Sequence, residues 1–262
     1  MGRGNERTDM RILLTNDDGI NAPGLSVLEE IAKEISDDIW IAAPEEEQSG
    51  KGRAISLTHP VRVRKVGAKA WAVSGTPSDA VLLATRDLMP DMPDLVLSGV
   101  NRGQNIAEDT SFSGTIAAAM FGMQLGVPSI ALSQAQNFRE RGSLSWETSK
   151  AWGAKAIRPL LEMRWPKDVV MNVNFPDVEP GDVRGIQITR QGFRDEAIIH
   201  TDRREDLRGN DYYWIGYRGK LSKPDEGTDI RAIYDGYVSI SPLHVDLTHE
   251  PFLKTLKESW QS

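Results

Sequence analysis

The sequence predicts an α/β fold in which a three-layer, doubly wound sheet is followed by a C-terminal β-rich extension. Two observations lead to this prediction. Short apolar runs alternate with helical patterns over roughly the first 175 residues, and the connections between them are mostly short. From Asp177 onward glycine and charged residues increase, and short β-like pieces replace the alternation. A parallel, Rossmann-like sheet with helices on both faces is the arrangement typical of such alternation.

The first strand, helix and strand can be read directly from the residues. Arg11–Thr15 is a short apolar run that ends at the turn residues 16–19, Asn-Asp-Asp-Gly. Pro23 opens a helix whose apolar residues recur on one face, and Ile39–Ala43 is the next buried strand. This strand–helix–strand unit predicts a right-handed parallel crossover.

The elements that follow extend the same pattern. Alternating residues between Ile55 and Val73 predict an antiparallel hairpin at the sheet edge, and Thr76 caps a helix that runs to Asp87. Further buried strands are expected at Asp94–Ser98, Val127–Leu132 and Val169–Phe175. Further helices are expected at Ser113–Leu125 and Ser143–Arg164. A long loop is expected at Gly99–Ser113.

The C-terminal part has weaker signals. Strand-like pieces occur at Ile186–Arg190, Tyr212–Tyr217 and Tyr237–Ile240, and a clear helical pattern appears only at Pro251–Trp260. Tyr212, Tyr213, Trp214 and Tyr217 form an aromatic cluster, which predicts an arm that contacts a partner subunit, although local packing is an alternative. We expect one domain over residues 10–262, with a core of about 10–175 and an extension with an arm over about 176–262.

The composition narrows the classes of protein. The 262 residues are 39% hydrophobic and 26% charged, as in globular proteins. A net charge of −7, from 31 basic and 38 acidic residues, disfavours duplex nucleic acid as a partner. The absence of cysteine excludes disulfides, thiolate catalysis and cysteine-based metal sites. It also fits a reducing compartment, so a cytoplasmic location is expected.

No targeting or membrane segment is expected. Residues 1–9 are charged and polar, and the apolar stretch after them is too short for a secretion signal, so we interpret them as a flexible leader. The longest uncharged span, Thr110–Phe138, is interrupted by serine, glutamine and proline. This span therefore predicts a buried helix followed by a buried strand rather than a membrane-spanning helix, and no membrane is expected as a partner.

Four polar side chains follow the predicted strands at the end where ligands bind in open α/β sheets. Asp17 and Asp18 follow the first strand, Ser49 lies in the loop after the second, and Asn101 follows Asp94–Ser98. Carboxylate, hydroxyl and amide oxygens suit Mg²⁺, Mn²⁺ or Ca²⁺. Each residue also has a plain structural interpretation: a turn for Asn-Asp-Asp-Gly, a solvated loop hydroxyl for Ser49 and a left-handed turn residue for Asn101.

A second candidate site precedes the predicted helix at Ser113. Ser113, Gly114 and Thr115 lie where free backbone N–H groups of a helix start can hold phosphate. Ordinary capping by Ser113 is the alternative. Several common catalytic patterns are absent: GxxxxGK[ST], GxGxxG after the first strand, GxSxG and HExxH. The four histidines are scattered along the chain and are expected to be structural or surface residues.

Five blocks in order resemble the stationary-phase survival protein (SurE) family. They are RILLTNDDGIN at 11–21, Ala43-Pro44 with Ser49-Gly50, SGTPSDAVLLA at 74–84, SGVNRGQNIAEDTSFSGT at 98–115 and TDIRAIYDGYVSISPL at 228–243. The resemblance implies a Rossmann-like fold with a C-terminal β extension that forms dimers or tetramers. It also implies a metal-dependent phosphatase for nucleoside monophosphates, with short polyphosphates as a substrate of some members.

The resemblance places Asp17, Asp18, Ser49 and Asn101 at the positions that hold one divalent cation per subunit, Mg²⁺ or Mn²⁺. Departures from the family fall outside these four positions and bear on substrate preference. Glycine is usual at Ala107 or Glu108, tyrosine is frequent at Phe112, and the loop Glu45–Gln48 is more acidic here.

The expected reaction is therefore hydrolysis of nucleoside 5′-monophosphates, with 3′-monophosphates and short polyphosphates as further possibilities. One of Asp17 and Asp18 ligates the cation while the other, Asp18 by preference, accepts a proton from the attacking water. Asn101, Asn105 and the segment Ser113–Thr115 orient the phosphate. The alternatives are a nucleotide-binding module without turnover, a Mg²⁺-dependent phospho-acceptor domain and a haloacid-dehalogenase-type phosphatase. The last two are disfavoured because the later strand ends in Ser98-Gly99 and Gly19 lies two positions after Asp17.

Overall fold

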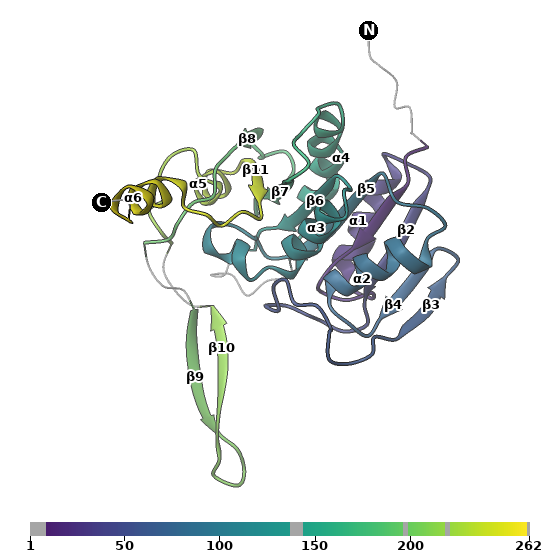
Figure 1. Cartoon of the computed structure of the whole chain (residues 1–262), viewed down its shortest axis with the longest axis horizontal. Helices are drawn as coiled ribbons and strands as arrows, with labels where there is room; N and C mark the ends of the chain where they lie inside the picture. Colours follow the sequence, from purple (N-terminus) through teal and green to yellow (C-terminus); the bar gives the residue numbers. More distant parts are fainter. Residues whose placement is uncertain (1–8, 137–143, 196–198, 218–220, 261–262) are drawn as a thin grey trace.

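A computed structural model describes residues 9–136, 144–195, 199–217 and 221–260 (Figure 1). The predicted leader therefore lies outside the described residues except for Asp9, and so does Ser143, the expected start of one helix. The strands are β1 (Ile12–Thr15), β2 (Ile39–Pro44), β3 (Val63–Gly67), β4 (Ala70–Val73), β5 (Leu95–Arg102), β6 (Ser129–Gln134), β7 (Val169–Phe175), β8 (Ile186–Ile188), β9 (Ile199–Glu205), β10 (Asp211–Tyr217) and β11 (Val238–His244).

The main sheet confirms the predicted doubly wound topology. Its order is β3-β4-β2-β1-β5-β6-β7-β11-β8, and the strands from β4 to β7 are mutually parallel. The chain runs outward from β1 through β2 to β4, then crosses back to β5 on the other side of β1. The order therefore reverses between β1 and β5, and the crevice outside the carboxyl ends of such strands is where ligands bind.

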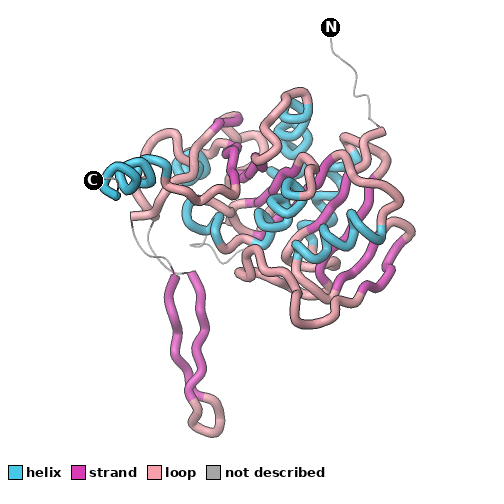
Figure 2. The backbone as a smooth tube through the Cα atoms, in the orientation of Figure 1, coloured by secondary structure: helices cyan, strands magenta, loops and turns pink. Residues whose placement is uncertain are grey.

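Helices cover both faces of this sheet (Figure 2). The α-helices are α1 (Pro23–Lys33), α2 (Pro77–Leu83), α3 (Gly114–Gln124), α4 (Glu147–Leu161), α5 (Asp229–Tyr234) and α6 (Glu250–Trp260), with a π-helical turn at Ala84–Leu88 and a 3₁₀ helix at Ala107–Ser111. α1 and α4 pack on one face, and α2 and α3 pack on the other. The result is the predicted three-layer arrangement.

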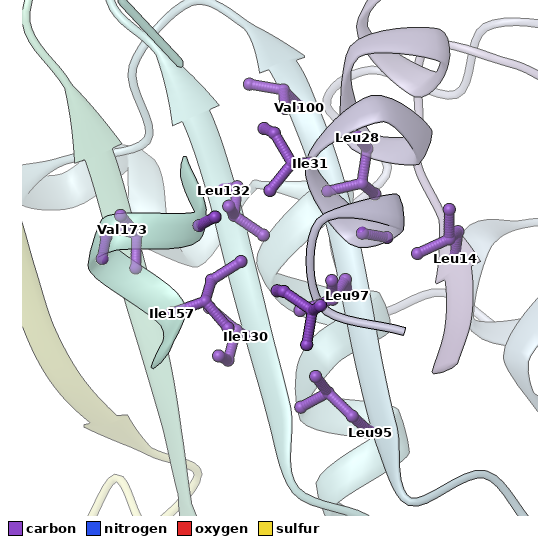
Figure 3. Packing of buried hydrophobic residues seen from close by; sticks show 14 of the residues in the cluster. Leu14, Leu28, Ile31, Leu95, Leu97, Val100, Ile130, Leu132, Ile157 and Val173 are labelled. Carbon is purple, nitrogen blue, oxygen red and sulfur yellow. The ribbon is translucent and has the colours of Figure 1, made fainter. Parts of the chain in front are cut away.

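The larger core lies between the sheet and the α1–α4 layer. Leu28 and Ile31 of α1 lie over the strands beside Leu97 and Leu132, and all four side chains are fully buried (Figure 3). Alternate residues along each strand face opposite layers, so Leu14 joins this core while Leu13 packs under α2. The apolar runs of the central strands are explained by burial on both faces.

The amino ends of the central strands carry a polar and aromatic cluster. Asp38 accepts hydrogen bonds from Arg11 Nε (2.9 Å), Lys69 Nζ (2.6 Å) and Trp40 Nε1 (2.8 Å). Trp40 stacks on Trp71 with ring centroids 5.7 Å apart. This cluster joins β1, β2 and the β3–β4 turn at the end of the sheet opposite to the crevice described above.

The C-terminal extension has two parts. β11 pairs antiparallel with β7 and parallel with β8, so these strands enlarge the main sheet. β9 and β10 form a separate two-stranded arm that extends away from the sheet (Figure 1). Tyr213 and Trp214 on this arm are 57% and 61% exposed, so the predicted arm does not bury its aromatic residues within the described chain.

Three expectations differ from the structure. The predicted loop Gly99–Ser113 contains the end of β5 and the 3₁₀ helix, because β5 continues to pair with β6 after a register shift. β9 was not expected, since its sequence IHTDRRE lacks an apolar run. α5 was not expected either, because six residues are too few to show a helical period. Among the described residues, no helix is both long and apolar enough to cross a membrane.

Candidate metal and phosphate site

A cavity of about 560 Å³ opens where the order of the sheet reverses. Asp17 follows β1, Asn101 lies at the carboxyl end of β5, and Ser49 comes from the loop after β2; all three line this cavity. The loop after β5 and the segment before α3 supply further parts of the wall. The structure therefore brings together three of the four predicted metal ligands.

The turn after β1 has both the structural and the site features considered for it. Gly19 N–H donates to Asn16 Oδ1 (3.2 Å), and Asn16 Nδ2 donates to the Gly19 carbonyl (2.9 Å). Gly19 has φ +103°, which favours glycine at this position. This closed turn fixes the backbone of Asp17 and Asp18 directly at the strand end.

Asp17 is almost completely buried in the wall. Its Oδ1 accepts a hydrogen bond from the Thr115 hydroxyl at the start of α3. Gly114 permits this approach, since a Cβ there would lie 2.7 Å from Asp17 Cβ. Burial, together with the neighbouring Asp18 carboxylate, raises the pKa of Asp17 to about 6, although the bond from Thr115 opposes the rise. A nearby cation would stabilise the ionised form of the Asp17 carboxyl against the effects of burial and of Asp18.

Asp18 is tied to the neighbouring strand rather than to the cavity wall. Its Oδ2 accepts a hydrogen bond from the backbone N–H of Arg102 (3.2 Å), the residue after Asn101. Burial raises the pKa of Asp18, and the Glu47 carboxylate raises it further, against the Arg102 N–H bond. Both acids of the pair are therefore held beside the end of β5, and both favour a positive charge in their vicinity.

Ser49 and Asn101 are also oriented by hydrogen bonds. Ser49 Oγ donates to Glu47 Oε1 (2.9 Å), and Asn101 Nδ2 donates to the Gly103 carbonyl (2.8 Å). The first bond uses the hydroxyl hydrogen of Ser49 and the second orients the Asn101 amide, so the lone pairs of Ser49 Oγ and Asn101 Oδ1 are left for a ligand. The backbone N–H of Gln48 donates to the Asp17 carbonyl (2.7 Å), which ties this loop to β1.

The donor chemistry fits a hard dication. Each of the four side chains has one contact that orients it and one oxygen left over, the usual division between ligand and supporting bonds. Within the described ranges, no group of three or more histidine, aspartate or glutamate side chains could hold a metal ion. A cation at this site would therefore depend on the serine and amide oxygens as well as on the two carboxylates.

The start of α3 is capped as predicted, and this limits its use as a phosphate site. Ser113 Oγ accepts the Ile116 N–H (3.0 Å), while Ser113 N–H donates to the Asp109 carbonyl (3.1 Å). The Thr115 hydroxyl is used by Asp17. Among the described residues, Gly114 N–H has no hydrogen-bond partner, so it is the donor of this segment that remains for a ligand.

Asn105 is supported by a buried network that the sequence did not indicate. Its N–H donates to Asn174 Oδ1 (2.8 Å), its Nδ2 donates to Ser133 Oγ (2.9 Å), and its carbonyl accepts from Asn172 Nδ2 (2.8 Å). Asn105 lines the cavity, and these partners come from β6 and β7. Asparagines at alternating positions of a buried strand were the available signal for this support.

The structure adds lining residues that sequence reasoning missed. Gln104, Asp109 and Gln136 face the cavity near the strand ends. Ile199, Ile215, Gly216 and Tyr217 of the arm line it as well. The aromatic cluster of the arm was visible in the sequence, but nothing there connected it with the end of β1.

Comparison with known proteins identifies the family. The profile of one family, Survival protein SurE, matches residues 12–197. The chain belongs to the SurE family. This finding confirms the resemblance that the five sequence blocks carried.

Relatives within the SurE family match nearly the whole chain. A protein of Caulobacter vibrioides (strain NA1000 / CB15N) named 5′-nucleotidase SurE is 58% identical over 250 residues, which are 95% of each chain. A protein of the same name from Parvibaculum lavamentivorans is 54% identical over 251 residues, 95% of this chain and 91% of that one. The crystal structure of the SurE protein from Aquifex aeolicus superposes with a TM-score of 0.80 at 36% identity, covering 95% of this chain and 98% of that one. The fold is therefore that of a solved SurE structure.

Proposed function

We propose that this SurE chain is a metal-dependent phosphomonoesterase that hydrolyses nucleoside 5′-monophosphates to nucleoside and phosphate. The observation that carries the proposal is the set of four oriented side chains, Asp17, Asp18, Ser49 and Asn101, each with an oxygen left for a cation. Relatives of similar length at 54–58% identity are named 5′-nucleotidase, which supports the same activity here. Nucleoside 3′-monophosphates and short polyphosphates are secondary candidate substrates.

One divalent cation per subunit, Mg²⁺ or Mn²⁺, is proposed to bind these four residues. When bound, it supplies positive charge that polarises the phosphoryl group and makes a water molecule more acidic. Hard oxygen donors favour these cations over zinc. The acidic chain needs such a charge locally, because among the described residues of the cavity wall Arg102 is the one basic side chain.

The protein groups position the phosphate and move the proton. Gly114 N–H, at the positive end of α3, donates to a phosphate oxygen. Asn105, held by its network on β6 and β7, orients the same group. Asp18, whose position is fixed by the Arg102 N–H, accepts the proton of the attacking water. Asp17, with one oxygen committed to Thr115, serves as ligand.

Assembly and location are proposed from the arm and from the composition. We propose a homodimer or homotetramer in which the β9–β10 arm contacts another subunit, because its aromatic residues are exposed on a two-stranded ribbon. A chain without cysteine fits the reducing cytoplasm.

Phosphate release from AMP tests the function. The protein with Mn²⁺ or Mg²⁺ is expected to release phosphate, and EDTA is expected to stop it until the cation is restored. Asp17→Asn and Asp18→Asn should each abolish the release, while Asp91→Asn, an exposed surface aspartate, serves as the matched control. Circular dichroism verifies that each variant is folded.

The outcomes separate this proposal from its alternatives. Near wild-type turnover in both site variants would remove the assignment of the cation site. Tight AMP binding without phosphate release, with either cation, would favour a binding module. A covalent aspartyl-phosphate trapped during turnover would favour the aspartate-nucleophile mechanism instead.

A further inference from the structure

The cavity has two chemically different walls. The strand ends supply oxygen donors, whereas the root of the arm supplies Ile199, Ile215 and Tyr217, and Phe112 lies in the segment before α3. These four side chains, which we name the arm-root patch, are between 39% and 73% exposed. An apolar surface on one side of a cavity and hard oxygen donors on the other are suited to a ligand with an anionic end and an uncharged end.

The pairing of the arm places its three side chains together. Tyr217 lies directly opposite Ile199 in the antiparallel register, and Ile215 is two residues before Tyr217 on the same strand. Residues opposite each other, or two apart on one strand, share one face of a sheet. The arm therefore presents one continuous apolar face to the cavity at its root.

A buried ion-pair cluster fixes this root beside the cavity. Arg194, whose side chain is 7% exposed, pairs through Nη2 with Asp109 Oδ2 (2.6 Å) and through Nη1 with Glu108 Oε2 (3.1 Å). Asp109 itself lines the cavity. Asp229 accepts the N–H of Ala107 (3.0 Å) and of Gly192 (2.8 Å), so the two segments are joined at a second point. Gly192 and Arg194, a few residues before β9, are thus held against the cavity wall.

The charges of the wall distinguish between substrates. Of the lining side chains, Asp17 and Asp109 are acidic and Arg102 is basic, and the arm-root patch carries no charge. Once the terminal phosphate is at the metal and helix donors, a second or third phosphate that extends towards the arm would meet the uncharged patch and Asp109 among the described lining residues. A flat aromatic base, by contrast, can stack on Tyr217 and Phe112 and pack against the isoleucines.

We propose that the arm-root patch is the nucleobase subsite of this enzyme. It makes the arm a specificity element that selects nucleoside monophosphates over phosphomonoesters without a base and over short polyphosphates. This inference rests on the proposed function, and it assigns to Phe112, Ile199, Ile215 and Tyr217 the recognition of a purine or pyrimidine ring.

The test compares substrates with and without a base, using the full chain loaded with Mn²⁺. AMP, ribose 5-phosphate and tripolyphosphate are assayed with the wild type, Tyr217→Ala and Phe112→Ala. Tyr213→Ala is the matched control, because Tyr213 lies on the same face of β10, is similarly exposed at 57% and does not line the cavity. Phe112 is outside the arm, so its variant is independent of any role of the arm in assembly.

The expected result is a loss of about tenfold in kcat/KM for AMP in Tyr217→Ala and Phe112→Ala, mainly through KM, since removing a stacking aromatic changes affinity by roughly 5- to 100-fold. The kcat/KM for ribose 5-phosphate should be unchanged, Tyr217→Phe should restore the AMP value, and Tyr213→Ala should behave as wild type. The wild type should prefer AMP to tripolyphosphate.

Failure of this inference differs from failure of the proposed function. If the wild type hydrolyses none of the three substrates, the phosphatase assignment is wrong. If it hydrolyses AMP and ribose 5-phosphate, but both variants lose the two activities equally or lose neither, the nucleobase subsite is refuted while the phosphatase stands. Tripolyphosphate used as well as AMP would refute the selectivity. Light scattering on each variant establishes that the assembly is unchanged.

Discussion

Gly114 offers a direct test of how closely the site depends on the position of Asp17. It is the first residue of α3 and has an ordinary φ, so alanine fits its backbone. The added methyl group would lie 2.7 Å from Asp17 Cβ and 2.8 Å from Asp17 Oδ2. Ordinary contact begins at 3.4 Å, so the Asp17 side chain or the helix start has to move by about 0.7 Å (3.4 − 2.7).

This displacement is large for a catalytic centre. Metal–ligand distances are held within about 0.2 Å, and an error of about 1 Å in position commonly costs about 100-fold in rate. Gly114→Ala should therefore lower kcat/KM for AMP by about 10- to 100-fold. The free energy of unfolding should fall by about 1–2 kcal/mol, because crowding costs about 1–3 kcal/mol and alanine recovers part of it through helix propensity.

Gly122 in the same helix is the matched control. A Cβ there would lie 2.6 Å from Ser129 Oγ and 2.9 Å from Val96 Cγ2, which are core atoms that do not line the cavity. Gly122→Ala should lower the free energy of unfolding to a similar degree and leave kcat/KM of the folded protein unchanged. Phosphate release and urea unfolding are measured for both variants. Wild-type activity in Gly114→Ala, or an equal loss in Gly122→Ala, would refute the reasoning.

Three further predictions concern stability and assembly. Although burial opposes it, hydrogen bonds from Lys69, Arg11 and Trp40 lower the pKa of Asp38 to about 2 from its ordinary 3.8. Its contribution is therefore complete above pH 4 and lost as the pH falls towards 2. After allowance for solvent screening, Asp38→Asn should lower the free energy of unfolding by about 1–2 kcal/mol at pH 7 and by much less at pH 2. Urea titrations at the two pH values measure the difference, and equal losses at both would contradict this. Arg194→Ala leaves two carboxylates without their cation and should cost about 3 kcal/mol in the same assay, whereas a loss below about 0.5 kcal/mol would mean that the pair is unimportant. Replacement of residues 199–217 by a short glycine–serine linker should reduce the mass found by light scattering, and an unchanged mass would exclude the arm from assembly.

Most of the sheet could be predicted because its signals are local. The central strands are apolar runs buried on both faces. α1 begins at Pro23 and α3 is capped by Ser113, and both residue types have known preferences at helix starts. β9 and α5 depend on distant partners instead. β9 is a strand because it pairs with β10, and α5 is held by burial of Ile230 and Ile233 and by the cap of Thr228.

The candidate site also has a part that local sequence signals predict and a part that depends on distant contacts. Asp17, Asp18, Ser49 and Asn101 could be predicted because parallel strands bring their carboxyl ends to one edge, whatever the details of packing. The parts supplied by the extension could not. Tyr217 lines the cavity, and Arg194 pairs with Asp109 in its wall, only because the chain beyond β8 comes back beside the segment after β5; no local pattern encodes that return.

The four residues of β1 join two regions with different roles. Before the strand, Arg11 is anchored in the Asp38 and Trp40 cluster; beyond it, Asp17 enters the cavity. Substitutions in that anchoring cluster can therefore raise or lower heat tolerance without disturbing the reaction chemistry, so the usual trade-off between robustness and activity is relaxed along this strand. A lineage moving to a warmer or colder habitat could adapt through residues such as Lys69 and Trp71 and keep its substrates.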